Sequence, residues 1–435
     1  MTRPPAPSPL RAVKGMNDVL PAEIGRWQRL EGSFREAFEL GGYREVRTPI
    51  VESTALFVRS IGEATDVVEK EMYTFARHDE SLTLRPEGTA GAARAYVEHQ
   101  QHLKEPSSRW YYLGPMFRAE RPQRGRYRQF WQAGAEVYGD SGPATDAEMI
   151  DMLAGLMKGL GIADVTVLVN SLGGAATRAR YRDALVAHLS PKRASLSEES
   201  QRRLEKNPLR ILDSKSKADQ EACADAPTIV DVLDDADRAH FDALRRHLDA
   251  LGTPYVVDAR LVRGLDYYTR TLFELRGAGG ELGAQNALGG GGRYDEMVRE
   301  LGGPSVPCIG FALGLERLLL AMSDAAAPGA TRRVYLAPMG EPAQGRCLTI
   351  AKELRAFRVE AEVDPRAKKV KDMLSRASAK GARFCVIVGD GELERGVAAV
   401  KDLTRHEQRD VPLAEVAKAL SAQLDDEGRA SGSPL

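Results

Sequence analysis

One short segment, residues 117–130, brings many cationic side chains together. Between Phe117 and Arg128 it contains five arginines and a single acid, a net charge of +4. Arginine presents a fixed fork of N–H donors that matches phosphate oxygens, and it keeps its charge at physiological pH. The aromatic residues among these arginines are suited to stacking on a nucleobase. The segment therefore predicts a phosphorylated ligand with a base; the alternative is a solvated basic hairpin.

Three further segments have compositions that suit a binding site. Residues 261–270 read Leu-Val-Arg-Gly-Leu-Asp-Tyr-Tyr-Thr-Arg, which alone also fits a strand with a polar edge. Residues 289–295 begin with four glycines that would let a ligand approach the backbone, although a loop without a ligand is the default expectation. They lack the Gly-Lys-Ser/Thr ending of a P-loop. Residues 310–318 predict a strand, a turn and an apolar helix, on which Arg317 needs a partner or a ligand.

Several other kinds of chemistry are excluded by what the sequence lacks. It contains no His-Glu-x-x-His and no Gly-x-Ser-x-Gly motif. Its four cysteines are isolated from one another and its seven histidines are scattered, so we expect no disulfide framework and no metal site made by a ligand cluster. The 61 Lys and Arg residues balance 62 Asp and Glu residues, which excludes a wholly basic nucleic-acid binder but not a local basic face. The chemistry that the sequence does support is the binding of phosphate groups by arginine side chains.

The cellular location follows from composition. No run of residues approaches the roughly 18 to 20 apolar residues of a membrane span. The N-terminus lacks the apolar core of a signal peptide, and residues 1–9 carry four prolines, as a flexible leader would. Isolated cysteines suit a reducing compartment. We therefore expect a cytoplasmic protein without a membrane partner.

The periodicity of apolar residues predicts the elements that must position these segments. Residues 22–40 predict an amphipathic helix, whose apolar side chains exceed what one short helix needs and so favour a homodimer: Ile24, Trp27, Phe34 and Phe38. Short strands between residues 72 and 138 indicate an antiparallel sheet. Residues 173–258 have helical periodicity and few strand signals. Strands and helices then alternate from residue 334 to 422, which predicts a small α/β domain.

Taken together and in this order, these segments resemble histidyl-tRNA synthetases, a family of class II aminoacyl-tRNA synthetases. Residues 261–268 and 291–295 are the most specific part of the likeness. The resemblance implies an α+β fold in which residues 1–325 form an antiparallel-sheet catalytic core with a helical insertion over 173–258. A linker (326–332), an anticodon-binding α/β domain (333–422) and a flexible tail (423–435) would follow. The family's motifs 1, 2 and 3 would lie at about 22–49, 109–136 and 310–320.

The resemblance also implies roles for individual residues. Histidine would contact Glu87, Gly88, Thr89, Arg118, Gln132, Glu136, Arg263, Tyr267, Tyr268 and Tyr294. ATP, with Mg²⁺ on its phosphates, would contact Arg118, Glu120, Arg126, Phe130 and Arg317. Transfer RNA would contact Arg121, Gln123, Arg124, Arg366, Lys368, Lys369 and Lys371. Arg263 and Arg118 would be the catalytic residues.

The implied activity is a two-step ligation. L-Histidine would react with ATP to give histidyl-adenylate and pyrophosphate, and histidine would then pass to the 3′ end of its tRNA. The alternative is a synthetase-like regulatory subunit of ATP phosphoribosyltransferase, a family that typically lacks the C-terminal domain and the arginine at position 263. One departure is Trp131, since many relatives have His-Gln where this chain has Trp131-Gln132. Alternation along a strand predicts that Trp131 faces away from the ligand.

Overall fold

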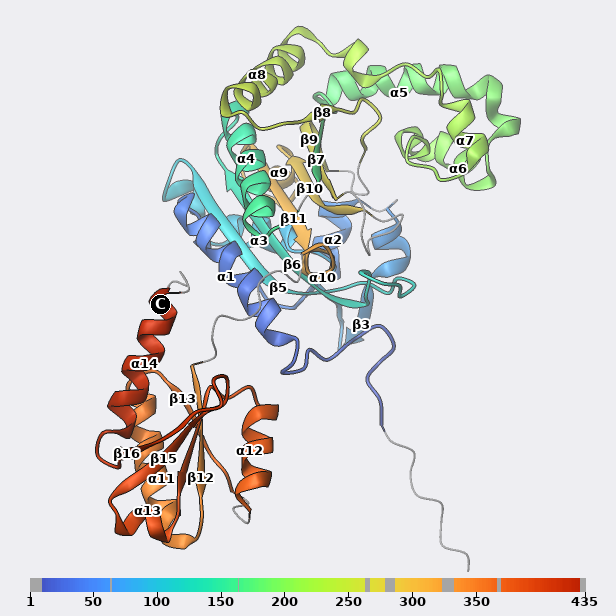
Figure 1. The fold of residues 1–435 in the computed structure, drawn as a ribbon. Helices are drawn as coiled ribbons and strands as arrows, with labels where there is room; N and C mark the ends of the chain where they lie inside the picture. Colours follow the sequence, from blue (N-terminus) through green and yellow to red (C-terminus); the bar gives the residue numbers. More distant parts are fainter. Residues whose placement is uncertain are drawn as a thin grey trace, which may run out of the picture. The chain divides into compact units, whose positions relative to one another are not determined.

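The computed structural model describes residues 10–62, 65–162, 164–262, 267–277, 286–322, 332–365 and 369–430, with side chains up to residue 426. It divides into two compact units, residues 1–323 and 324–435 (Figure 1). No helix in these ranges is both long and apolar enough to cross a bilayer. Each unit has its own sheet and its own buried clusters.

The first unit is built on an eight-stranded sheet, which confirms the predicted antiparallel catalytic fold. All neighbouring strands pair antiparallel except at the two edges, where β1 lies parallel to β5 and β8 parallel to β7. In spatial order the strands are β1 (Arg44–Glu45), β5 (Ser108–Phe117), β6 (Gln129–Tyr138), β11 (Cys308–Gly314), β10 (Ala287–Arg293), β9 (Thr269–Gly277), β7 (Val165–Ser171) and β8 (Val256–Val257).

Four helices share the main hydrophobic core with this sheet: α1 (Ile24–Leu40), α4 (Pro143–Gly159), α8 (Asp235–Leu251) and α10 (Leu315–Ala321). On α1 the buried residues are Trp27, Leu30, Phe34 and Phe38, as the periodicity predicts. The apolar face of α1 is therefore consumed inside the chain, with only Ile24 partly exposed. The argument that this face is surplus and left for a second copy is wrong.

The first unit also contains a second, smaller group of strands and helices. A three-stranded sheet of β2 (Val51–Ser53), β4 (Glu80–Leu84) and β3 (Tyr73–Arg77) lies with α2 (Thr54–Ile61), the π-helix η1 (Val67–Glu71), α3 (Thr89–Glu98) and the short helices η2 (Gln101–Leu103) and α9 (Met297–Glu300). Tyr267, Tyr268 and Tyr294 belong to a second buried cluster, together with Tyr96 of α3.

The run of glycines at 289–292 forms the middle of strand β10, not the loop expected from sequence. A Cβ atom on Gly291 would lie 2.0 Å from the carbonyl oxygen of Gly310 on β11. One on Gly292 would lie 2.4 Å from the carbonyl oxygen of Thr271 on β9. These glycines are therefore required by the close approach of neighbouring strands, and no single-sequence signal separates this need from that of a loop.

The segment 173–258 is mostly helical, as predicted. Its last part, helix α8 and strand β8, packs with the main sheet. Helices α5 (Ala175–Leu189), α6 (Glu198–Lys206) and α7 (Lys217–Ala222) lie together beside the sheet, with the 3₁₀ turns η3 (Ser190–Ser195), η4 (Pro208–Ile211) and η5 (Ile229–Val232) (Figure 1). Phe241, Leu244 and Leu248 place α8 in the main core instead. The helical run near the end of this segment is interrupted between η5 and α8, because Asp234 caps α8 by accepting a hydrogen bond from the backbone N–H of Asp237 (2.9 Å).

The second unit is a five-stranded α/β domain, in agreement with the predicted fold class. Its strands, in spatial order, are β13 (Glu360–Val363), β12 (Arg333–Pro338), β14 (Phe384–Val388), β15 (Val397–Asp402) and β16 (Gln408–Pro412). Helices α11 (Glu341–Ala356) and α14 (Val416–Ala430) contribute to one apolar cluster and α12 (Val370–Ala379) to another, while α13 (Asp390–Glu394) is short. Residues 423–430, expected in the flexible tail, continue α14.

Helix α1 offers a test of the main core. The Phe34 ring is 1% exposed and packs edge-on to Tyr111 with 6.4 Å between ring centroids. We expect Phe34→Ala to lower the free energy of unfolding of the first unit by about 3 to 5 kcal/mol. Leu40→Ala, at an 82% exposed position on the same helix, should change it by no more than about 0.5 kcal/mol. Urea unfolding followed by tryptophan fluorescence measures both; equal effects would contradict this assignment of the core.

Candidate active site

The binding segments converge on one cavity of about 640 Å³ in the first unit. Strands β6, β9, β10 and β11 provide its floor, and the segment between β5 and β6 provides one wall. Of the residues predicted to bind histidine or ATP, the cavity is lined by Glu87, Thr89, Arg118, Glu120, Arg126, Phe130, Gln132, Tyr267, Tyr268, Tyr294 and Arg317. Residues far apart in sequence are thus gathered at one place.

Glu136 lies immediately behind this lining and is fully buried on β6. Its carboxyl group accepts hydrogen bonds from the hydroxyl groups of Tyr294 and, at 3.1 Å, Tyr112. Burial raises the pKa of Glu136 from its ordinary 4.5 to about 8, against the lowering effect of the Tyr294 hydroxyl. A Cβ atom on Gly310 would lie 1.5 Å from Oε2 of Glu136, so only glycine leaves room for this carboxyl group.

Glu87 stands at the N-terminus of α3. Its two carboxylate oxygens accept the backbone N–H groups of Thr89 (2.7 Å) and Ala90 (2.8 Å). These bonds satisfy free donors of the first helical turn and hold the carboxylate in place. Burial nevertheless raises the pKa of Glu87 above its ordinary value. Glu87 is therefore a fixed acceptor whose remaining lone pairs can receive an ammonium group.

The arginine-rich segment divides into ligand-facing and structural residues. Its backbone pairs Arg118 N–H with the carbonyl oxygen of Arg128 (2.9 Å), which closes a hairpin. Arg118 lies over the ring of Phe130, 5.3 Å from its centroid, and Arg126 forms an ion pair with Glu120 (2.9 Å). Arg128 instead donates to the carbonyl oxygen of Glu120 (3.2 Å). The exposed residues Arg121, Gln123 and Arg124 do not line the cavity.

Arg317, the charge that the sequence leaves without a partner on helix α10, lies where the hairpin meets the sheet. Its Nε donates to the carbonyl oxygen of Gly125 (3.2 Å) and its Nη1 to that of Ala287 (2.8 Å). Its neighbour Glu316 accepts the backbone N–H of Trp131 with both oxygens (2.9 and 3.1 Å). Burial raises the pKa of Glu316 to about 7. Helix α10 thus fixes the hairpin and strand β6 together.

The unusual Trp131 faces away from the cavity, as predicted. Its ring packs edge-on against that of Trp27, with 6.2 Å between the centroids, while Gln132 lines the cavity. The alternation of side chains along β6 therefore places Trp131 in the packing between α1 and β6.

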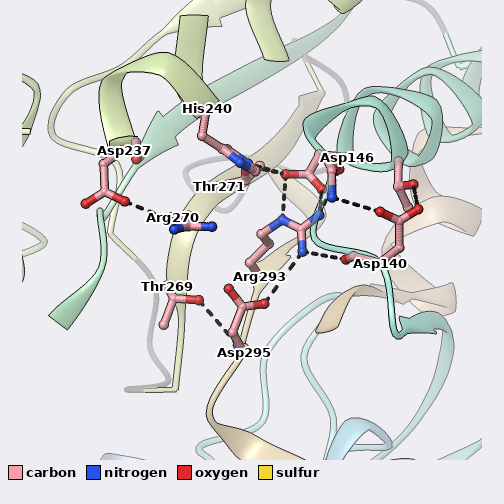
Figure 2. A network of polar contacts seen from close by, with 12 residues as sticks. Asp140, Asp146, Asp237, His240, Thr269, Arg270, Thr271, Arg293 and Asp295 are labelled. Carbon is pink, nitrogen blue, oxygen red and sulfur yellow. Dashed lines mark hydrogen bonds and ion pairs between the residues drawn. The ribbon is translucent and has the colours of Figure 1, made fainter. Parts of the chain in front are cut away.

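Arg293, the residue before Tyr294, is the centre of a buried polar network. Figure 2 shows Arg293 surrounded by carboxylate and carbonyl oxygens. Its Nη2 lies 2.6 Å and its Nε 3.0 Å from the two oxygens of Asp146. The guanidinium also donates to the backbone carbonyl oxygens of Asp140 (2.8 Å) and Gly142 (2.9 Å). Arg293 and Asp146 are both 0% exposed, so this is a completely desolvated ion pair.

The same Asp146 carboxylate connects two further elements. Thr271 of β9 donates to it (2.5 Å), and Nε2 of His240 on α8 lies 3.0 Å away (Figure 2). We assigned no role to any of these residues from sequence. The only signal was an arginine between a glycine run and a tyrosine, which does not reveal a buried partner 147 positions earlier.

Some predicted site residues cannot be placed. Arg263, Arg366 and Lys368 lie outside the described ranges. Lys369 and Lys371 are exposed at the start of α12 in the second unit.

Residues 366–383 contain seven Lys and Arg residues and one Asp, but this positive charge is partly compensated within the domain. Arg376 forms an ion pair with Asp364 (2.5 Å), and Arg383 forms one with Asp402. Lys380 is likewise bound to Glu362. The cationic surface of this segment is therefore smaller than its composition suggests.

Comparison with known proteins decides the family. The family model of histidyl-tRNA synthetase matches residues 15–318, and that of an anticodon-binding domain matches residues 333–423. The chain belongs to the histidyl-tRNA synthetase family. Among its relatives, a protein named histidine–tRNA ligase from Sorangium cellulosum is 61% identical over 95% of this chain and 96% of its own length. A histidine–tRNA ligase from Syntrophotalea carbinolica is 45% identical over 94% of this chain and 98% of its own length.

Solved structures agree on the fold. The apo histidyl-tRNA synthetase of S. aureus superposes with a TM-score of 0.80 at 35% identity, covering 95% of this chain and all of that one. An ATP phosphoribosyltransferase regulatory subunit/histidyl-tRNA synthetase from Bacillus halodurans has a TM-score of 0.63 at 23% identity, covering 85% of this chain and 97% of that one, and shows a shared fold only.

The described residues offer no built-in metal site. No group of three or more His, Cys, Asp or Glu side chains among them is arranged to bind a metal ion. Of the cavity carboxylates, Glu120 already contacts Arg126 (2.9 Å) and Glu316 is occupied by Trp131.

The raised pKa of Glu136 predicts how stability depends on pH. Between about pH 4.5 and pH 8 the folded state keeps a proton that the unfolded state loses, so stability falls as pH rises through this window. We expect Glu136→Gln to remove this contribution, which amounts to about 1.4 kcal/mol per pH unit. Urea unfolding between pH 5 and pH 8 measures the difference.

Glu36→Gln, an exposed substitution on α1, is the control and should keep the wild-type slope. If Glu136→Gln and the wild type lost stability in parallel over this range, Glu136 would be ionised in the folded protein.

Proposed function

We propose that the protein is a histidine–tRNA ligase. One observation carries this proposal: a single cavity is lined both by Tyr294, whose hydroxyl binds the buried Glu136 directly behind it, and by the arginines of the ATP wall, Arg118, Arg126 and Arg317. The first group suits an imidazole and the second suits a triphosphate. The relatives named histidine–tRNA ligase, which match nearly the full chain, support the same activity.

Recognition of histidine would use both nitrogens of its imidazole ring. Glu136 would accept one N–H, and a tyrosine hydroxyl would contact the other nitrogen, so that a different amino acid would leave buried polar groups unpaired. Glu87 and Thr89 at the N-terminus of α3 would hold the ammonium group. The remaining contacts would come from Gly88, Gln132, Tyr267 and Tyr268.

Activation is an in-line displacement at phosphorus. A carboxylate oxygen of histidine forms a bond to the α-phosphorus of ATP while the bond to the pyrophosphate oxygen breaks, which gives histidyl-adenylate and pyrophosphate. Arg118 would contact the histidine carboxylate and the α-phosphate, and Arg126 and Arg317 the γ-phosphate end, with Glu120 nearby. Phe130 and Arg317 would enclose the adenine. Mg²⁺ would neutralise the outer phosphates, and positioning by fixed charges supplies most of the catalysis.

The second unit would recognise the tRNA. It matches an anticodon-binding domain, and Lys369 and Lys371 are exposed at the start of α12, beyond the predicted contacts Arg366 and Lys368. Arg121, Gln123 and Arg124, which are exposed on the hairpin, would contact the acceptor end. Phosphate contacts of this kind give affinity without sequence readout.

The proposal includes a cytoplasmic homodimer. The apolar face of α1 does not support it, since that face is buried inside the chain. Exposed apolar side chains on and beside the three-stranded sheet do support an interface: Ile50, Val51 and Phe75 are each about 40% exposed.

Pyrophosphate exchange into ATP tests the activity directly. Exchange that depends on histidine, when each of the twenty amino acids is offered in turn, is the expected result. A regulatory subunit without catalytic activity would show no exchange with any of them.

Arg263 is the sharpest single-residue prediction. In the family this arginine stands near the α-phosphate, where other class II enzymes use magnesium. Because a guanidinium there would act mainly in the transition state, we expect Arg263→Ala to lower the rate of adenylate formation roughly 10²- to 10³-fold, or about 3 to 4 kcal/mol. Arg263→Lys should recover only part of this, because a point charge cannot reproduce two parallel hydrogen bonds.

Single-turnover adenylate formation at saturating ATP and histidine measures the effect, with a thermal melt to verify folding. A well-folded Arg263→Ala enzyme with a normal rate constant would remove Arg263 from the mechanism. Parallel loss of stability and substrate affinity would instead indicate a structural ion pair.

The role of the second unit is tested by removing residues 326–435. We expect the truncated protein to lose tRNA charging far more than histidine-dependent pyrophosphate exchange, because the first unit contains the whole cavity and its own core. Equal loss of both activities would mean that the second unit only stabilises the first.

A further inference from the structure

The N-terminal segment of the chain forms a tight turn beside the hairpin between β5 and β6. Residues 13–16 make up this N-terminal turn, which is closed by a hydrogen bond from the backbone N–H of Met16 to the carbonyl oxygen of Val13 (2.9 Å). Gly15, the third residue of the turn, has a φ of +85°. A type II turn requires a positive φ at this position, and glycine adopts it without strain. The turn is therefore specified locally by Gly15.

This turn is hydrogen-bonded to the hairpin. The carbonyl oxygen of Gly15 accepts the backbone N–H groups of Arg128 (2.7 Å) and Gln129 (3.3 Å). Nη1 of Arg128 donates to the carbonyl oxygen of Lys14 (3.4 Å), and its Nε donates to that of Glu120 (3.2 Å). Arg128 thus joins the N-terminal turn to both arms of the hairpin.

The turn and the hairpin are also in close contact. A Cβ atom on Gly15 would lie 2.8 Å from Cγ of Pro122 and 3.1 Å from Cγ of Arg128. The proline ring is rigid, and the Arg128 side chain is held by its two carbonyl contacts, so neither group can move aside easily. A side chain at position 15 would therefore displace the hairpin from the turn.

A further hydrogen bond connects this contact to the cavity. The backbone N–H of Arg118 donates to the carbonyl oxygen of the same Arg128 (2.9 Å), and Arg126 lies two residues before it. Arg118 and Arg126 line the cavity, whereas Gly15 and Arg128 do not. An effect of Gly15 or Arg128 on a ligand in the cavity would therefore act through the position of the hairpin.

The N-terminal segment is fixed at its other end by the main core. It continues into α1, where Trp27 packs edge-on against Trp131 of β6 with 6.2 Å between the ring centroids. Arg26 of the same helix donates to the carbonyl oxygen of Leu319 on α10 (2.9 Å), the helix that carries Arg317. The N-terminal turn therefore connects the hairpin to a well-packed part of the first unit.

We propose that Gly15 and Arg128 are positioning residues for ATP, because they hold the hairpin where Arg118 and Arg126 meet the phosphates. The inference rests on the proposed function, which assigns these two arginines to ATP. The pocket for histidine would be affected much less, since its two carboxylates lie at the N-terminus of α3 and in the buried part of β6.

The test compares Gly15→Ala with Gly42→Ala in the full-length protein. Gly42 has a φ of +80°, and an added Cβ there would meet nothing within 4 Å among the described residues, so this control introduces similar strain without displacing the hairpin. In histidine-dependent pyrophosphate exchange, we expect Gly15→Ala to raise the KM for ATP about 10-fold and to change the KM for histidine less than about 2-fold, because displaced arginines no longer meet the phosphates. Gly42→Ala should leave both constants unchanged.

Arg128→Gln is a second variant, which leaves the backbone of the turn intact. It removes the side-chain contacts to Lys14 and Glu120, so it should also raise the KM for ATP selectively. Arg128→Lys should recover part of the loss, because an ammonium group can still donate to one of the two carbonyl oxygens. This variant decides the question if Gly15→Ala does not fold.

Hydrogen exchange over residues 120–130, measured by mass spectrometry without substrates, tests the contact independently of activity. Exchange should become faster in Gly15→Ala and Arg128→Gln but not in Gly42→Ala, because the N–H groups bonded to Gly15 lose their acceptor or its support.

Three results would overturn the inference: an equal rise of both KM values, the same changes in Gly42→Ala, or unchanged KM and hydrogen exchange in Gly15→Ala and Arg128→Gln. The first two would indicate a general loss of structure, and the third would mean that the hairpin is positioned without the turn. If the wild-type protein showed no pyrophosphate exchange, the proposed function would fail, while hydrogen exchange would still decide whether the turn holds the hairpin.

Discussion

The ion pair between Arg293 and Asp146 is completely buried, and the site depends on it. Removing two charges from water costs several kcal/mol for each ion, which is recovered only when every donor and acceptor finds a partner. Here the guanidinium is surrounded by the Asp146 carboxylate and two backbone carbonyls, while Thr271 and His240 contact the same carboxylate. The pair thereby joins α4, α8, β9 and β10 in one arrangement, and loss of either ion would leave the other uncompensated.

This buried network is connected directly to the cavity, because Arg293 is followed in the chain by the cavity-lining Tyr294. Arg293 ends strand β10, so fixing its side chain fixes the position of Tyr294, whose hydroxyl donates to Glu136. Glu136 has room only because β11 places Gly310 beside it, and the glycines of β10 allow the two strands to approach. The position of the Glu136 carboxyl group is therefore set by backbone packing and by a buried charge pair, not by its nearest neighbours alone.

The sequence predicted correctly those parts of the fold in which apolar residues repeat with the period of one helix or one strand. The three- and four-residue spacing of Trp27, Phe34 and Phe38 fixed both the helix and its buried face, and strand alternation placed Trp131 outside the cavity. The failures involve relations between distant segments. The glycine run was expected as a loop because the need for its missing side chains lies on β9 and β11. The surplus face of α1 was misjudged because its partners, such as Phe311, come nearly 280 residues later.

Backbone carbonyl oxygens hold two arginines of the cavity in place before any ligand binds. Arg317 is oriented by the carbonyl oxygens of Gly125 and Ala287, and Arg118 by that of Pro86 (2.8 Å), so both present their charge without reorganisation when phosphate binds. Such preorganisation suits a small substrate that must be held within a fraction of an ångström.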